Sequence, residues 1–310
     1  MAGTPLVSGE KPEGEVRTAL RIVEVEAGDA QQRIDNFLLR ELRGLPRSRV
    51  YGLLRRGEVR VNGGRVKPAH RLAAGDQVRI PPVRLRQSEP VATGQRTLHQ
   101  LTAAILYEDD HFLAINKPAG LAVHGGSGVS GGVIEGLREL RPHSRLELVH
   151  RLDRDTSGVL LLARRGPALR AAHEAFVRGH VRKTYRAVVA GRWPRHRHLI
   201  EAPLMRFVRG GERLVRVDPE GRSARTEFSV VDARASTTLI EARPATGRTH
   251  QIRVHAAHAG HPILGDDKYG ADGQRSGRLM LHALRLVVPL EAMDTTLELE
   301  TPMPADFEGD

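Results

Sequence analysis

The sequence has 310 residues, of which 48 are Lys or Arg and 37 are Asp or Glu, giving a formal net charge of +11. This length suggests about two domains with a sizeable core, and the basic balance indicates a polyanionic partner. The lack of cysteine excludes a disulfide framework and thiolate zinc sites, and fits a reducing cytoplasm. No stretch approaches the roughly 18 apolar residues of a membrane span, and residues 1–17 lack a signal-peptide core. We therefore expect a soluble, non-secreted, cytoplasmic protein without a membrane partner.

A disordered tail and a small folded domain are predicted for the N-terminal part of the chain. Residues 1–20 begin with a stretch rich in Gly, Pro and Glu that has no apolar periodicity, as expected of a disordered tail. Over residues 34–42 apolar side chains fall at i, i+3, i+4 and i+8, which predicts an amphipathic helix. A second helix is predicted over residues 46–57. Short strands follow at 58–61 and 77–80, the first closed by an Asn-Gly turn.

Most of the excess positive charge lies in this same region. Between residues 31 and 90 there are 14 Arg or Lys and 5 Asp or Glu, a net charge of +9. Because Arg presents a fork of donors to phosphate, the arginines of the second predicted helix are candidate RNA contacts: Arg47, Arg49, Arg55 and Arg56. The run RGEVRVNG at 56–63 resembles the S4-type RNA-binding domain, which would cover residues 21–82. A basic surface without a ligand is the alternative. Only Phe37 and Tyr51 interleave with the charges, so recognition of a duplex or backbone is expected.

Residues 83–102 are predicted to link two domains. They are polar and punctuated by proline, with no periodicity, so a second domain is expected over residues 103–310. This domain opens with predicted strands at 105–107 and 112–115 around an acidic turn. Lys117 follows the second strand and is a candidate contact for RNA phosphate, with an ordinary turn lysine as the alternative.

A glycine-rich stretch at residues 124–132 admits a different class of enzyme. It contains G-x-S-x-G around Ser130, the pattern of a serine hydrolase nucleophile. In such enzymes the serine directly follows a buried strand, and the oxyanion loop lies elsewhere in the sequence. Here both patterns are fused in one stretch without a strand between them. A plain glycine-rich loop before a helix at 133–140 is therefore favoured.

The segment HRLDRDTSG at residues 150–158 concentrates the polar chemistry of the second domain. The apolar run at 159–163 predicts a buried strand, so the segment is expected to form a loop that holds a carboxylate rigidly. The composition of the loop alone does not choose between Asp153 and Asp155. The segment resembles, at every position, the catalytic motif of the RluA-type pseudouridine synthases, which isomerise uridine in structured RNA. That resemblance implies that Asp153 is the catalytic carboxylate and that Arg151 fills the space left by a flipped nucleotide.

Tyr185 lies in a second segment that carries the resemblance. A helix is predicted at 167–177 and a strand at 182–189, in which Tyr185 follows a basic pair. The resemblance implies that its ring stacks on the target base, and a half-buried strand tyrosine is the alternative. Residues 204–221 carry four arginines around Gly-Gly and predict a basic hairpin, which either lies over RNA or is simply solvated.

The segment TGRTHQIRVH at 246–255 is the third that carries the resemblance. It predicts a helix with Thr249 as N-cap. The resemblance implies that Arg253 pairs with Asp153, whose ionised form a nearby cation stabilises, and Arg248 is a further candidate RNA contact. Four histidines admit a metal site: His250, His255, His258 and His261. Their spacings of five, three and three do not give the i, i+4 pair of a zinc helix, so no metal is expected.

The resemblance covers the chain from about residue 28 onward. It implies an α+β fold, with a catalytic domain on a mixed, largely antiparallel sheet flanked by helices and a small N-terminal α/β RNA-binding domain. It also implies uridine isomerisation without a cofactor, with Asp153 acting as nucleophile or as base. Within the family, the C-type enzymes, which modify several uridines of 23S rRNA, are closest and the D-type enzymes are the alternative. The expected partner is 23S rRNA, free or in a pre-ribosomal particle, and the protein is expected to be a monomer. A non-catalytic ribosome assembly factor is the remaining alternative.

Overall fold

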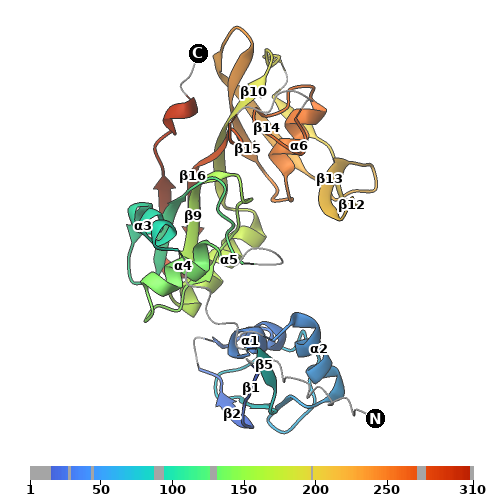
Figure 1. Ribbon diagram of the computed structural model, residues 1–310, viewed down its shortest axis with the longest axis vertical. Coiled ribbons are helices and arrows are strands. Elements are labelled where there is room, and N and C mark those ends of the chain that lie inside the picture. The colour runs from blue at the N-terminus through green and yellow to red at the C-terminus, as the bar shows by residue number, and fades with distance from the viewer. Residues whose placement is uncertain are drawn as a thin grey trace, which may run out of the picture. The chain divides into compact units, whose positions relative to one another are not determined.

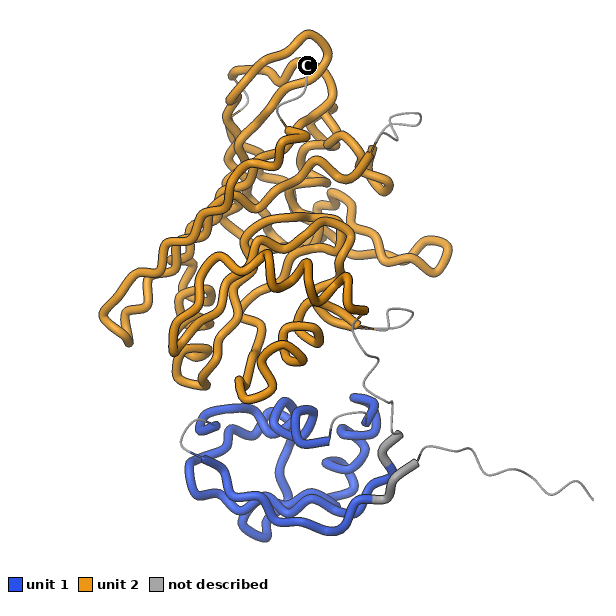
Figure 2. The backbone as a smooth tube through the Cα atoms, turned by 60° about the vertical axis from the view of Figure 1, so that its left-hand side comes forward, with its two compact units in different colours: residues 1–92 blue, residues 93–310 orange. Residues whose placement is uncertain are grey.

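The computed structural model describes residues 15–26, 29–42, 45–86, 94–125, 131–196, 198–270 and 277–307. The chain divides into two compact units, residues 1–92 and residues 93–310, drawn as ribbons in Figure 1 and coloured separately in Figure 2. Within the described residues no helix is both long and apolar enough to cross a membrane.

The first unit packs two helices against a small antiparallel sheet. The helices are α1 (Ile34–Glu41) and α2 (Arg47–Arg56), and the sheet has the order β2 (Arg21–Glu24), β4 (Gln77–Ile80), β3 (Arg60–Val61). The predicted apolar face of α1 is buried in a core shared with α2 and β4. Gly57 ends α2 in a left-handed conformation at φ 69°, which glycine adopts without strain. The predicted Asn-Gly turn is present, with φ 48° at Asn62 and 78° at Gly63.

Two predictions about the edges of this unit are wrong. Residues 15–17, predicted as tail, form β1 (Glu15–Arg17), which pairs with β5 (Arg84–Arg86) in the predicted linker. The predicted linker also contains part of a helix, α3 (Gln95–Ala103), whose Leu98 and Leu101 are buried. Both segments are polar in composition, so the sequence pattern did not predict them. The partner of β1 lies far along the chain, and α3 buries only a narrow apolar face.

A ten-stranded sheet forms the centre of the second unit. Its main path runs β11 (Leu199–Glu201), β14 (Arg225–Ala233), β15 (Thr237–Pro244), β10 (Arg182–Ala190), β16 (Leu281–Leu290), β9 (Ser157–Ala163), β7 (Phe112–Lys117) and β6 (Ile105–Glu108). In addition, β17 (Thr295–Glu300) pairs with β16, and β8 (Glu147–Leu148) pairs with β9. Neighbouring strands are antiparallel except β9 and β16, which are parallel. The predicted α+β fold with a mixed, largely antiparallel sheet is confirmed.

Helices cover both faces of β9, and all seven of its residues are buried. Leu160 and Leu162 pack in a core with α4 (Val133–Leu140), whereas Val159 and Leu161 pack in a core with α5 (Gly166–Arg178). A strand covered on both sides appears in sequence as a continuous apolar run. This burial fixes the strand that follows the 150–158 loop.

The other half of the sheet carries α6 (Gln251–His258), which packs through Ile252 and Ala256 on β10 and β15. The predicted basic hairpin forms a separate two-stranded sheet, β12 (Leu204–Arg209) and β13 (Glu212–Val217), which shares a small core with Val254 of α6. Figure 1 shows the hairpin beside this helix. Two short 3-10 helices, η2 (Glu291–Met293) and η3 (Ala305–Phe307), flank β17. The fold thus brings the 150–158 loop, β10 and the start of α6 to one place.

Candidate active site

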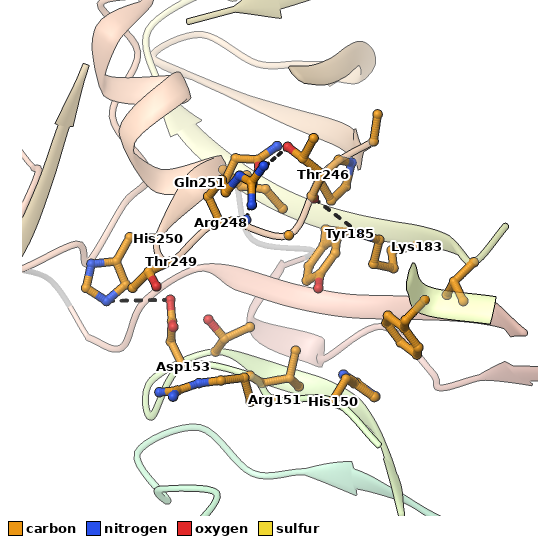
Figure 3. A pocket seen from close by; sticks show the side chains of 18 of the residues that line it. His150, Arg151, Asp153, Lys183, Tyr185, Thr246, Arg248, Thr249, His250 and Gln251 are labelled. Atoms are coloured by element: carbon orange, nitrogen blue, oxygen red, sulfur yellow. Dashed lines mark hydrogen bonds and ion pairs between the residues drawn. The ribbon is translucent and has the colours of Figure 1, made fainter. Parts of the chain in front are cut away.

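A cavity of about 650 Å³ lies where these three segments meet, and its lining includes Asp153, Tyr185 and Arg253. Figure 3 shows the side chains of Asp153 and Tyr185 in this cavity. The three residues come from distant parts of the sequence, yet the fold brings them together. Arg151 and Arg248 also line the cavity and are exposed, so both are open to a ligand at its mouth.

The loop geometry separates the two acids that its composition left equivalent. Asp153 lines the cavity and its side chain is 22% exposed. Asp155 instead pairs with the neighbouring Arg154 at 2.9 Å and is absent from the cavity lining. The loop closes with Gly158 at φ 113°, where an added Cβ would lie 2.2 Å from the carbonyl oxygen of Ala283. Only glycine fits where β9 approaches β16 this closely.

Lys117 lies beneath this loop and not at the surface. Its ammonium donates to three backbone carbonyls, those of Pro118 at 2.7 Å, Leu121 at 2.8 Å and Arg154 at 2.8 Å, and the residue is fully buried. Burial lowers the pKa of Lys117 to about 7, while the nearby charges of Asp155 and Asp153 act to raise it. The prediction that Lys117 contacts RNA phosphate is therefore wrong, because this side chain ties the loop to β7.

Arg253 is the fixed cation of the site. Its guanidinium binds Asp266 in a bidentate pair, with Nε at 2.8 Å and Nη2 at 2.6 Å, while Nη1 lies 3.8 Å from Oδ2 of Asp153. Burial alone would lower the pKa of Arg253, but the hydrogen bonds and charge of Asp266, with the charge of Asp153, raise it above its usual value. The predicted partner of Arg253, Asp153, is therefore a second and longer contact. The principal partner, Asp266, was not identified from the sequence.

Tyr185 reaches the cavity through an irregularity in its strand. The pairing of β10 with β16 shifts register between Thr184 and Tyr185, a bulge of the kind that re-aims a side chain. Burial, assisted by the negative charge of Asp153, raises the pKa of the Tyr185 hydroxyl well above its usual value. The side chain therefore presents a neutral, protonated phenol to the cavity at neutral pH.

His250 and Tyr269 complete the site and were not predicted as functional residues. His250, and not Thr249 as predicted, is the N-cap of α6, in a left-handed conformation at φ 52°. The Thr249 hydroxyl instead accepts a hydrogen bond from Arg206 of β12 at 2.5 Å. The His250 ring lies between Tyr269 and Asp153, with Nδ1 2.7 Å from the Tyr269 hydroxyl and Nε2 3.9 Å from Oδ2 of Asp153. Figure 3 shows His250 pointing towards Asp153.

The histidine cluster considered from the sequence does not converge in space. His255 binds Thr226 at 2.9 Å and the carbonyl of Ala202 at 3.0 Å inside the core. His261 contacts the carbonyl of Ala190 at 2.9 Å. Among the described residues no group of three or more His, Cys, Asp and Glu is arranged for a metal ion.

The remaining sequence candidates are four arginines of the first unit and one serine of the glycine-rich stretch. Four arginines of α2 are exposed on the first unit, and Arg56 among them also pairs with Glu58: Arg47, Arg49, Arg55 and Arg56. Ser130, the nucleophile of the hydrolase alternative, lies outside the described residues.

Comparisons with known proteins show which families this chain is similar to. The family described as RNA pseudouridylate synthase matches residues 111–258, and the S4 domain matches residues 32–78. The chain is 50% identical over 298 residues to the ribosomal large subunit pseudouridine synthase C of Escherichia coli (strain K12), covering 92% of this chain and 93% of the relative. The enzyme of that name from Pasteurella multocida (strain Pm70) is 47% identical over 309 residues, covering 96% and 95%. A solved structure of human RNA pseudouridylate synthase domain containing 4 is similar, with a TM-score of 0.57 and 29% identity over 69% of this chain and 93% of that one.

Proposed function

We propose that this chain, which belongs to the RNA pseudouridylate synthase family, isomerises several uridines of 23S rRNA. Within that family it is an RluA-type enzyme of the C-type large-subunit branch with an N-terminal S4 domain. The observation that carries the proposal is the gathering of Asp153, Tyr185 and Arg253 in one cavity of a chain this similar to those enzymes. We assign catalysis to residues 93–310 and RNA capture to the first unit.

The proposed reaction is an isomerisation, so its atoms balance without a cofactor. The bond from ribose C1′ to uracil N1 breaks, the base turns, and a bond forms from C1′ to C5. The proton on C5 is lost and N1 gains one. Asp153 is the proposed essential carboxylate, and two routes are open to it, attack on C1′ or removal of a proton from the ribose. Arg253 places a positive charge 3.8 Å from this carboxylate.

Tyr185 is proposed to hold the detached base. A tyrosine ring offers a flat apolar surface on which uracil can stack. Burial raises the pKa of its hydroxyl, so in the free enzyme Tyr185 presents this ring with a protonated phenol.

Access to this cavity requires the target nucleotide to leave its stack, at a cost of a few kcal/mol. Arg151, exposed beside Asp153, is proposed to occupy the vacated space. Arg248 at the cavity and the four arginines of α2 are proposed to bind phosphates. Lys183 is a further candidate, because it lines the cavity and carries a cationic side chain, whose ammonium donates to the carbonyl of Thr246 at 3.3 Å. We also propose that the protein acts as a monomer in the cytoplasm, on free rRNA or a pre-ribosomal particle.

The test is a map of pseudouridines in 23S rRNA from cells with and without the gene, complemented by the wild-type chain or by Asp153→Asn. The proposal expects several positions to lose pseudouridine and to regain it only with the wild-type chain. Rescue by Asp153→Asn would move the essential role to another residue, whereas unchanged rRNA with a defect only in ribosome assembly would favour a non-catalytic assembly factor instead.

A further inference from the structure

The carboxylate of Asp153 has two nitrogen neighbours among the described residues, and both face the same oxygen. Nη1 of Arg253 lies 3.8 Å and Nε2 of His250 lies 3.9 Å from Oδ2. Both distances are longer than a hydrogen bond, which is common for catalytic contacts before substrate binds. The other nitrogens of Arg253 are held by Asp266, which is buried. His250 is therefore the second group that can act on Oδ2.

The position of the proton on the His250 ring follows from its other neighbour. The Tyr269 hydroxyl accepts the backbone N–H of Val215 at 3.0 Å, which leaves its own proton to be donated to Nδ1 of His250 at 2.7 Å. Burial raises the pKa of Tyr269 to about 12, so this proton stays on the hydroxyl at neutral pH. A ring that accepts at Nδ1 and is neutral carries its hydrogen on Nε2.

Burial is the largest influence on the His250 ring and favours its neutral form. Burial lowers the pKa of His250, and the positive charges of Arg253 and Lys268 act in the same direction. The carboxylates of Asp153 and Asp266 oppose this effect without reversing it. The backbone of His250 is also unusual. Its left-handed conformation at φ 52° is uncommon outside glycine, and such conformations occur often at functional sites.

We propose that His250 is a positioning residue of the reaction, whose Nε2–H, oriented by Tyr269, holds Oδ2 of Asp153 together with Arg253. When the nucleoside enters, the carboxylate moves by about 1 Å to reach hydrogen-bond distance from both donors. Oδ2 is then occupied twice, and Oδ1 is left to act on the ribose. The inference rests on the proposed function, since it assigns a task to Oδ1 in that reaction.

Two substitutions of His250 separate its two contacts. His250→Gln places an amide N–H near the position of Nε2, so it keeps the donor to Asp153. His250→Asn places its amide near Nδ1, so it keeps only the contact with Tyr269. Asn also adopts the left-handed backbone more readily than Gln. Backbone strain would therefore favour His250→Asn, whereas the proposal favours His250→Gln.

The kinetic test measures kcat and KM of the full chain on a 23S rRNA fragment that contains a mapped target. We expect His250→Asn and His250→Ala to lower kcat about 10- to 100-fold, the effect of losing a hydrogen bond to a charged group, with KM within about threefold. His250→Gln should retain kcat within about threefold of wild type. Equal activity of the Gln and Asn variants, or a change confined to KM, would overturn the role of His250.

A spectroscopic test of the same proposal does not depend on turnover. In the chain labelled with ¹⁵N-histidine, the ring resonances of His250, identified by their loss in His250→Asn, should show the neutral Nε2–H tautomer at pH 7. Tyr269→Phe should shift the ring towards a mixture of tautomers. An Nδ1–H tautomer or an imidazolium in the wild-type chain would overturn the inference even if the enzyme is active. A wild-type chain that shows the expected tautomer but forms no pseudouridine would instead refute the proposed function.

Discussion

Replacing Asp266 by Asn tests how the site holds its cation. Arg253 is 2% exposed and its main partner, Asp266, is fully buried, so the pair has been removed from water. Removing one member of a buried pair leaves an uncompensated charge, which costs about 3–5 kcal/mol. Because Asn retains one hydrogen-bond acceptor and Asp267 lies 3.4 Å away, we expect the lower end, about 3 kcal/mol. For a unit of this size that corresponds to a fall in Tm of roughly 6–12 °C.

The adjacent Asp267 provides a matched control. Its side chain is 57% exposed and contacts the same nitrogen of Arg253 at 3.4 Å. An exposed ion pair contributes about 0–1 kcal/mol, so Asp267→Asn should lower Tm by less than about 4 °C. The assay is differential scanning calorimetry of the full chain, following the transition of residues 93–310. Equal shifts in the two variants would mean that burial does not govern the pair, and would refute the reasoning.

Three further predictions concern catalysis, RNA binding and strand packing. Asp153→Asn should abolish pseudouridine formation while RNA affinity, measured by filter binding, stays within about threefold, and retained turnover would move the role to Asp155. Removing residues 1–92 should reduce the slope of log K against log salt by roughly 3, as expected for four lost arginine contacts with phosphate; an unchanged slope would place the RNA footprint elsewhere. Gly158→Ala should lower Tm and activity together, because its Cβ would lie 2.2 Å from the carbonyl oxygen of Ala283, and an unaltered melting curve would contradict this close packing.

The elements with strong periodicity could be predicted from the sequence because local pattern and burial agree in them. The strand at 159–163 and the helix at 133–140 are examples, since their apolar residues all find partners. Lys117 could not be assigned, because its partners are three backbone carbonyls brought together only by the folded loop. No pattern of side chains in the sequence marks such a site.

The contacts of His250 beside Asp153, the proposed catalytic acid, could not be predicted from the sequence either. Thr249 is a good N-cap by residue type, but it is held by Arg206, and the helix begins one residue later behind His250. This shift of one residue turns the His250 ring towards Asp153. His250 adopts a left-handed backbone at the start of α6 and contacts Tyr269, whose hydroxyl accepts the N–H of Val215 in β13. Local helix propensity does not report such tertiary contacts.

The parallel junction of β9 and β16 consists of two residue pairs, His282 with Ser157 and Ala283 with Gly158. Asp153 lies before β9, on one side of this strand pairing, whereas Tyr185 in β10 and Arg253 in α6 lie on the other side. A rotation of a few degrees between β9 and β16 would change the gap between the carboxylate of Asp153 and the ring of Tyr185 while leaving each half of the sheet intact. The gap between Asp153 and the ring of Tyr185 therefore depends on these two residue pairs.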